Sequence, residues 1–234
     1  MTGLPGTSER LRAFVAEVPL ERRVILDLAA GAARALEPGA RILDAGAGEG
    51  PYRELFGHCD YTSTDWSHSS HPGAHGADII APLDALPLPD ASFDGVLCTQ
   101  VLEHVADPSA VLAELHRVLV PGGSLWLTVP FVGQLHEEPF DYFRYTGYGL
   151  RALLEGAGFA ALEVEPIGGY FSSLGLLLHA CGLSIGVEST RADLPRRLLA
   201  GACRAIGALL PRLDRLDHRR ALPLGYTCRA VRCV

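Results

Sequence analysis

The chain has 234 residues, 48% of them hydrophobic, and a mean hydropathy of +0.19, which suits one α/β domain that needs no cross-links to bury its core. The formal charge of −7 argues against a nucleic-acid-binding protein, because affinity for phosphates depends on cationic side chains. No apolar stretch reaches the roughly 18 to 20 residues of a membrane span, and the first residues lack the layout of a secretory signal, so we expect a cytoplasmic protein.

Two further features of composition narrow the class of protein. The six cysteines include no C-x-x-C pair, so the sequence predicts neither a zinc site nor a disulfide framework. The charge is distributed unevenly. Residues 191–220 hold eight arginines against three aspartates, a net charge of +5, which leaves −12 for the rest of the chain.

Hydrophobic periodicity predicts two helices, at 8–17 and 20–36, before the first strand. Strands are then predicted at 41–45, 61–64, 78–80, 95–99 and 124–129, with helices at 52–56 and 109–119. Pro121-Gly122-Gly123 is expected to end the second of these helices and begin the next strand. A helix at 150–157, a strand at 160–165, a helical apolar segment at 170–216 and a final strand at 226–233 follow. This alternation indicates a parallel sheet with helices on both faces.

We interpret the chain as one domain in four parts. Residues 1–38 form an N-terminal helical cap, 39–169 a cofactor-binding core, 170–218 a helical insert and 219–234 the final strand.

The first predicted strand runs into a glycine-rich turn, Asp44-Ala45-Gly46-Ala47-Gly48-Glu49-Gly50, which lets a ligand approach the backbone closely. A dinucleotide site would need G-x-G-x-x-G, but here the third glycine comes one residue early, which disfavours an NAD-dependent enzyme. Asp44 at the strand end would repel a pyrophosphate, yet it can accept hydrogen bonds from a ligand ammonium group.

Asp65 follows the second strand, where an acid can bind ribose hydroxyls. An ammonium site at one strand end and a ribose site at the next describe an amino-acid nucleoside, of which S-adenosylmethionine is the common example. The alternative for the glycine turn is an ordinary strand-to-helix loop.

Longer segments carry a family resemblance. They are LDAGAGEG at 43–50, LPLPDASFDGVLCTQVLEHVADP at 86–108, ELHRVLVPGGSLWLTVP at 114–130 and EEPFDYFRYT at 137–146. In these segments the chain resembles class I S-adenosylmethionine-dependent methyltransferases of the broad "methyltransferase type 11" group. The resemblance implies a doubly wound, mostly parallel, seven-stranded Rossmann-like sheet with an antiparallel last strand. It says little about the acceptor.

Carried over by position, the resemblance implies that Asp44, Gly46 and Gly48 surround the methionine part of the cofactor. Asp65 would bind the ribose, and Trp66 would lie against the adenine edge. Thr99 and Gln100 would lie beside the sulfonium. Relatives often bind the adenine amino group with an acid where this chain has Pro82, so Asp84 or the backbone of Leu83 is the candidate for that contact.

Candidate catalytic residues follow the fifth strand. His136 is a candidate general base near neutral pH, Tyr142 would orient an acceptor, and Arg144 would bind a carboxylate or phosphate. In the alternative interpretation this is a structural loop, in which Arg144 pairs with Asp141 or Glu138 and His136 satisfies a backbone carbonyl.

Other histidines have weaker functional interpretations. His104, beside the predicted sulfonium position, is the second candidate base, although a role in the architecture of the pocket is the favoured interpretation. His68, His71 and His75 have spacings that suit a metal, but a surface loop is the favoured interpretation, and we expect no bound metal.

The sequence thus predicts an enzyme that moves a methyl group from S-adenosylmethionine to a small-molecule, lipid-like or saccharide-like acceptor, most readily at oxygen. The alternatives are a non-catalytic S-adenosylmethionine-binding or scaffolding protein and an N- or C-methyltransferase of a natural product. The insert at 170–218 is interpreted as a substrate lid or core helices, as a homodimer contact or as a peripheral membrane contact.

Overall fold

A computed structural model describes residues 7–17, 19–68, 76–187 and 193–233 of the chain. The chain divides into two compact units. The first comprises residues 1–129, 135–165 and 226–234, and the second comprises residues 130–134 and 166–225. Among the described residues, no helix is long and apolar enough to cross a membrane.

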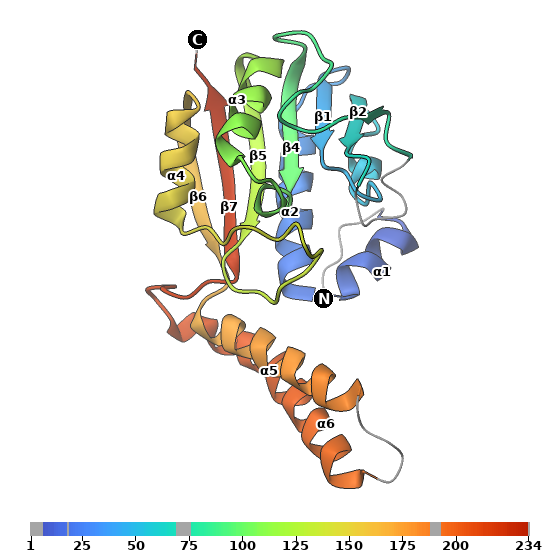
Figure 1. The fold of residues 1–234 in the computed structure, drawn as a ribbon, viewed down its shortest axis with the longest axis vertical. Helices are drawn as coiled ribbons and strands as arrows, with labels where there is room; N and C mark the ends of the chain where they lie inside the picture. Colours follow the sequence, from blue (N-terminus) through green and yellow to red (C-terminus); the bar gives the residue numbers. More distant parts are fainter. Residues whose placement is uncertain (1–6, 18, 69–75, 188–192, 234) are drawn as a thin grey trace. The chain divides into compact units, whose positions relative to one another are not determined.

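The first unit is built on a seven-stranded sheet with the strand order β3-β2-β1-β4-β5-β7-β6. Its strands are β1 (Arg41–Ala45), β2 (Asp60–Asp65), β3 (Ile79–Ile80), β4 (Phe93–Thr99), β5 (Leu119–Pro130), β6 (Phe159–Ile167) and β7 (Gly225–Arg232). The strand pairs β1–β2, β1–β4, β2–β3 and β4–β5 are parallel. Figure 1 shows the arrow of β7 running opposite to that of β4. The predicted α/β fold with a mixed seven-stranded sheet is therefore confirmed.

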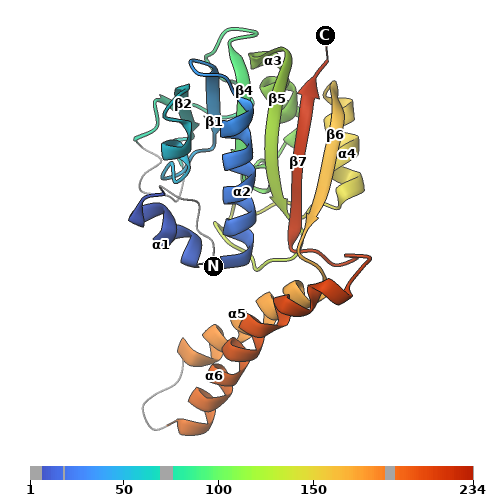
Figure 2. The ribbon, with the colours of Figure 1, turned by 180° about the vertical axis from the view of Figure 1, so that it is seen from behind.

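Helices cover both faces of this sheet. The helix α2 (Pro19–Ala35) lies on the face seen in Figure 2, next to α1 (Glu9–Glu17). The helices α3 (Pro108–Val118) and α4 (Gly147–Gly156) lie on the opposite face, which Figure 1 presents. Each face has its own core of buried apolar side chains, centred on Leu112 and Leu127 on the α3 side and on Ile42 and Leu97 on the α2 side.

The strand order places a natural ligand site at the carboxyl end of β1. Along the chain the sheet first grows from β1 toward β3, and then on the other side of β1 toward β4 and β5. The loops that follow β1 and β4 run to opposite sides of the sheet, and a crevice forms between these loops. In doubly wound sheets this crevice is the usual position of a ligand.

Two local predictions were wrong, and the bounds of a third differ by one residue. The helix predicted at 52–56 is a single 3₁₀ turn, η1 (Arg53–Phe56). The strand predicted at 78–80 contains only Ile79 and Ile80. Pro121-Gly122-Gly123 does not separate helix from strand, because α3 already ends at Val118 and β5 begins at Leu119, which pairs with Phe93 of β4. Cross-strand pairing thus outweighs the local turn signal.

The second unit is dominated by the helices α5 (Tyr170–Val187) and α6 (Leu194–Leu209), followed by the 3₁₀ segment η4 (Leu210–Leu216). Asp214 and Asp217 accept hydrogen bonds from the first backbone N–H groups of α5, with Asp217 Oδ2 2.7 Å from the nitrogen of Tyr170 and Asp214 Oδ1 3.0 Å from that of Phe171. These carboxylates satisfy donors that an α-helix leaves open at its N-terminus.

Candidate active site

Asp44 lies near the end of β1 with only 2% of its surface exposed. Its carboxylate accepts a hydrogen bond from the hydroxyl of Tyr61 on the neighbouring strand β2. Burial raises the pKa of Asp44 to about 6, and the hydrogen bond from Tyr61 opposes that rise. A partly desolvated carboxylate of this kind gains most from a cationic ligand group, because the charged form is otherwise costly there.

The glycine turn after β1 has a backbone conformation that favours glycine. Gly46, Gly48 and Gly50 all have positive φ, between +55° and +76°. A Cβ on Gly46 would also lie 2.5 Å from a methyl group of Val101. The turn is therefore specified by conformation at all three glycines and by steric contact at Gly46.

Asp65, at the end of β2, is buried and organises this turn. Its Oδ2 accepts a hydrogen bond from the backbone nitrogen of Gly48 at 2.7 Å, and its Oδ1 accepts one from that of Trp66 at 2.8 Å. Each carboxylate oxygen can accept a second hydrogen bond. Asp65 can thus hold the glycine turn and still accept hydrogen bonds from the hydroxyls of a sugar.

A cavity of about 720 Å³ joins these strand ends. Every residue predicted for the cofactor or for catalysis lines it, except Arg144. These residues are Asp44, Gly46, Gly48, Asp65, Trp66, Leu83, Asp84, Thr99, Gln100, His104, His136 and Tyr142. Because two carboxylates, an indole and a glycine backbone surround one space, the cavity offers the groups that S-adenosylmethionine requires. The individual binding roles remain predictions, including the choice between Leu83 and Asp84.

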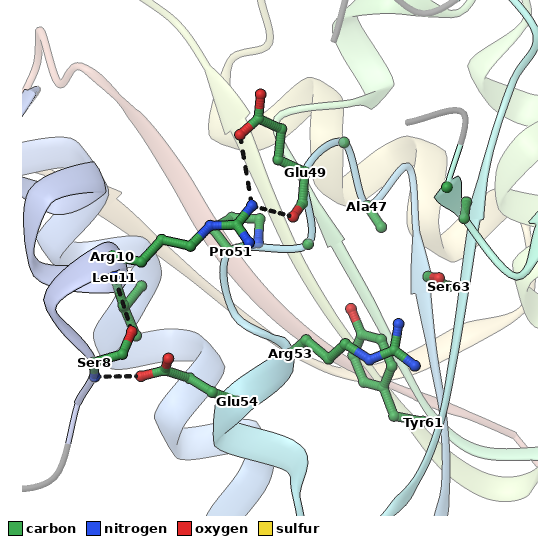
Figure 3. A pocket seen from close by; sticks show the side chains of 14 residues that line it. Ser8, Arg10, Leu11, Ala47, Glu49, Pro51, Arg53, Glu54, Tyr61 and Ser63 are labelled. Atoms are coloured by element: carbon green, nitrogen blue, oxygen red, sulfur yellow. Dashed lines mark hydrogen bonds and ion pairs between the residues drawn. The ribbon is translucent and has the colours of Figure 1, made fainter. Parts of the chain in front are cut away.

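A smaller cavity of about 410 Å³ is also lined by residues of the glycine turn (Figure 3). Arg10 of α1 reaches Glu49 of the turn, with 3.7 Å between Nη2 and Oε2, and it donates a hydrogen bond to the Glu49 backbone oxygen at 3.2 Å. The backbone nitrogen of Ser8 donates to Glu54 at 2.8 Å. The N-terminal segment therefore contacts the glycine turn and η1, which its sequence did not reveal.

His104 ends the 3₁₀ turn η3 (Leu102–His104), and only 12% of its side chain is exposed. Its Nδ1 lies 3.0 Å from the backbone oxygen of Phe140. A carbonyl oxygen only accepts hydrogen bonds, so Nδ1 carries the proton and Nε2 keeps its lone pair in the neutral ring. Burial lowers the pKa of His104, which favours this neutral form.

The segment after β5 brings His136 to the same place. The imidazole rings of His104 and His136 meet edge to face, with 4.7 Å between their centroids. Backbone nitrogens of Tyr142 and Phe143 donate to the oxygen of Glu103 at 2.9 and 3.3 Å, which fixes this segment to η3. The structure thus unites both candidate bases.

Arg144 does not line the cavity. It holds Asp141 through two hydrogen bonds, at 2.6 and 2.8 Å, and Asp141 is 1% exposed at its side chain. This ion pair holds the pKa of Asp141 far below its usual range. The geometry matches the structural alternative, and Arg144 acts here as a support for Asp141, whose Oδ2 accepts a hydrogen bond from the backbone nitrogen of His136 at 3.0 Å.

Glu103 is a functional candidate that sequence reasoning missed. Its side chain is fully buried, and neither carboxylate oxygen has a hydrogen-bond partner among the described residues. Burial raises its pKa to about 8, which favours the neutral, protonated form of the carboxyl group. The residue type gave no sign of this, because glutamate is ordinarily a surface residue.

Within the described ranges, one group of side chains has the residue types of a metal site, namely Glu103, His104 and His136, with ligand atoms within 4.8 Å of one another. Two ligands held about 2.1 Å from one ion lie at most about 4.2 Å apart, so binding would require these side chains to close in. His68 is described as an exposed residue beside Trp66, whereas His71 and His75 lie outside the described residues. The absence of a resident metal stays a prediction.

In the comparison with protein families, residues 43–127 match the model described as a methyltransferase domain. A probable S-adenosylmethionine-dependent methyltransferase of Mycolicibacterium smegmatis is 34% identical over 59% of this chain and 58% of its own length. A ubiquinone biosynthesis O-methyltransferase of Xanthomonas axonopodis is 35% identical over 40% of this chain and 44% of its own length. The chain thus spans about half the length of these curated relatives.

Solved structures share the fold. The [4+2]-cyclase SpnF superposes with a TM-score of 0.59 at 22% identity, covering 91% of this chain and 81% of its own. A S-adenosylmethionine-dependent methyltransferase from Archaeoglobus fulgidus gives 0.58 at 16% identity, covering 94% and 99%. At these identities the likeness establishes the architecture alone.

Proposed function

We propose that this chain transfers a methyl group from S-adenosylmethionine to a hydroxyl oxygen of a small-molecule, lipid-like or saccharide-like acceptor, because residues 43–127 match the model of a methyltransferase domain and a probable S-adenosylmethionine-dependent methyltransferase is 34% identical over 59% of this chain. One observation carries the proposal. Asp44 and Asp65 line the same cavity as the paired imidazoles of His104 and His136.

The cofactor end of the cavity is assigned as follows. Asp44 would accept hydrogen bonds from the ammonium of the methionine part, and Asp65 would accept them from the ribose hydroxyls. When bound, S-adenosylmethionine supplies a methyl group on a sulfonium that is displaced in line. Thr99, the last residue of β4, and Gln100, which follows it, would lie beside that position. Gln100 is held there by its backbone N–H, which donates to the Thr128 oxygen at 3.0 Å.

The acceptor end would supply proton removal and orientation. A hydroxyl is a weak nucleophile, so its proton has to pass to a base as the new C–O bond forms and the C–S bond breaks. The Nε2 lone pair of neutral His104 suits this step, with His136 as the second candidate. Tyr142 would orient the acceptor. An amine acceptor would not need either base, which is why the histidine pair favours oxygen. The O-methyltransferase among the relatives supports the same choice.

The test compares His104→Ala and His136→Ala with His58→Ala. His58 binds backbone oxygens at the end of α2 and does not line the cavity. Tritiated methyl transfer from S-adenosylmethionine would be measured with a catechol and with a demethylated quinol as probes. Loss of the general base should lower kcat by roughly 10²- to 10⁴-fold, while calorimetry with S-adenosylhomocysteine shows cofactor affinity close to that of the parent.

The outcomes separate the alternatives. Equal turnover in the two variants and the parent would remove both histidines from the mechanism. Tight S-adenosylmethionine binding without transfer to any oxygen, nitrogen or carbon acceptor would favour the non-catalytic binding protein. A methylated amine or carbon product would contradict the assignment to oxygen.

A further inference from the structure

The two helices of the second unit pack through small residues. A Cβ on Gly175 would lie 2.6 Å from the backbone oxygen of Gly207, and a Cβ on Gly182 would lie 2.8 Å from that of Ala200. The helices α5 and α6 run side by side in both views (Figures 1 and 2). Glycine contacts of this closeness leave no room for large apolar side chains between the helices.

The large apolar side chains of α6 therefore point outward. Ala200 and Gly207 are buried and mark the side that faces α5. At about 100° per residue, the opposite side of the helix carries an apolar arc roughly 140° wide. It consists of Leu194, Leu198, Leu199, Ile206 and Leu209, which are between 51% and 65% exposed. We call these five residues the α6 outer face.

The neighbouring helix extends this apolar character. Residues 170–187 of α5 contain no Asp, Glu, Lys or Arg. Its Tyr170, Leu174 and Leu177 are between 41% and 55% exposed. A surface helix of a globular domain usually turns its apolar stripe toward a core, whereas here two adjacent helices expose theirs.

The charges of α6 are all of one sign. Its charged residues are Arg196, Arg197 and Arg204, which are exposed and lie on the half of the helix opposite to the α6 outer face. Arg212 and Arg215 follow in η4, while Asp214 of η4 and Asp217 after it cap α5. A helix with an apolar face and a cationic opposite half is the pattern of helices that lie in a membrane interface.

We propose that the α6 outer face binds the surface of a bilayer that contains anionic phospholipids, with its apolar arc in the acyl boundary and Arg196, Arg197 and Arg204 at the headgroups. Charge favours a bilayer over a second copy of the α5–α6 helix pair as the partner of the α6 outer face. A second copy would contribute only further arginines, because neither α5 nor α6 holds an acidic residue that could pair with them. An anionic lipid surface satisfies both the apolar face and the cations.

The test is flotation of the full chain with extruded vesicles, either pure phosphatidylcholine or phosphatidylcholine with about one third phosphatidylglycerol. One variant is Leu198→Ser with Leu209→Ser, and a second is Arg196→Gln with Arg197→Gln. The matched controls are Tyr148→Ser, at an 89% exposed aromatic in α4, and Arg229→Gln, at an exposed arginine in β7.

The parent should bind the anionic vesicles and lose most of that binding at 1 M salt, where charges are screened within about 3 Å. The leucine variant should bind at least roughly tenfold more weakly, since two apolar side chains no longer enter the boundary. Each arginine near an anionic surface contributes about fivefold, so the arginine variant should bind about 25-fold more weakly. Both controls should bind like the parent.

Two results would overturn the proposal. The first is a parent protein that floats no better with anionic vesicles than with neutral ones. The second is a parent that forms a dimer in solution, dissociates on introduction of Leu198→Ser with Leu209→Ser, and does not float, which would make the α6 outer face a self-association surface. Unchanged far-ultraviolet circular dichroism and unchanged S-adenosylmethionine affinity in the variants would establish that each is folded.

Discussion

Replacement of Asp65 by alanine tests the assignment of the cofactor site most directly. Its carboxylate accepts two backbone hydrogen bonds, from Gly48 and Trp66, and retains acceptor capacity toward the cavity. A hydrogen bond to a charged group contributes about 1.5 to 3 kcal/mol. At about 1.4 kcal/mol per factor of ten, Asp65→Ala should weaken S-adenosylmethionine binding by roughly 10- to 100-fold.

The same change also removes a support of the glycine turn, so a matched variant is needed. Asp78 likewise accepts hydrogen bonds from β2, at 2.9 Å from the Ser63 nitrogen and 2.7 Å from its hydroxyl, but it does not line the larger cavity. Isothermal calorimetry with S-adenosylmethionine, together with urea unfolding without cofactor, would compare Asp65→Ala with Asp78→Ala. A dissociation constant within twofold of the parent for Asp65→Ala would refute the reasoning, as would an equal loss of affinity in both variants.

Two further predictions concern the backbone and the buried acid. Gly46→Ala should lower the free energy of unfolding by about 1 to 3 kcal/mol and weaken cofactor binding, because it adds a clash with Val101 to the strain of positive φ. Gly39→Ala is the matched control, because its φ is +82° and no atom lies within 4 Å of the new Cβ, so it should show the effect of the strain alone. Glu103→Gln should flatten the dependence of stability on pH. The folded pKa of about 8 exceeds the ordinary 4.5, so the parent binds more protons when folded, and its stability should fall by up to about 1.4 kcal/mol per pH unit between these values. Urea unfolding from pH 5 to pH 8 would check this, and parallel curves for Glu103→Gln and parent would contradict it.

Local sequence signals and hydrophobic periodicity were enough to predict those helices and strands in which local propensity and tertiary packing favour the same structure. The strand at 41–45 was predicted with its observed bounds because an apolar run ends in a glycine-rich turn of positive φ. Asp107 caps α3 through hydrogen bonds of 3.1 Å to the nitrogens of Ser109 and Ala110, and the predicted helix lies within one residue of the observed one. Failure came where pairing between distant segments decided the outcome, as at Leu119 opposite Phe93.

The candidate site shows the same division. Acids at strand ends can be placed from sequence, because parallel strands bring their carboxyl ends to one edge of the sheet. The partner of a flexible side chain cannot be predicted from sequence in this way. For Arg144, the contact with Asp141 was only one of the alternatives that the sequence left open. The burial of Glu103 and the hydrogen bond from Tyr61 to Asp44 depend on which side chains meet across the packed elements, and no spacing in the sequence encodes that.

The proposed acceptor chemistry and the proposed lipid contact rest on different residues, so experiments can separate them. The cavity is lined by residues of the first unit, and the α6 outer face belongs to the second. If the acceptor is lipid-like, anionic vesicles should raise the turnover of an acceptor embedded in them, and Leu198→Ser with Leu209→Ser should abolish that gain without changing turnover of a water-soluble catechol. If the acceptor is a soluble saccharide-like molecule, vesicles should leave its turnover unchanged even though the protein floats with them. A gain that survives the leucine substitutions would mean that the acceptor reaches the cavity without the α6 outer face, and the membrane contact would then have no part in catalysis.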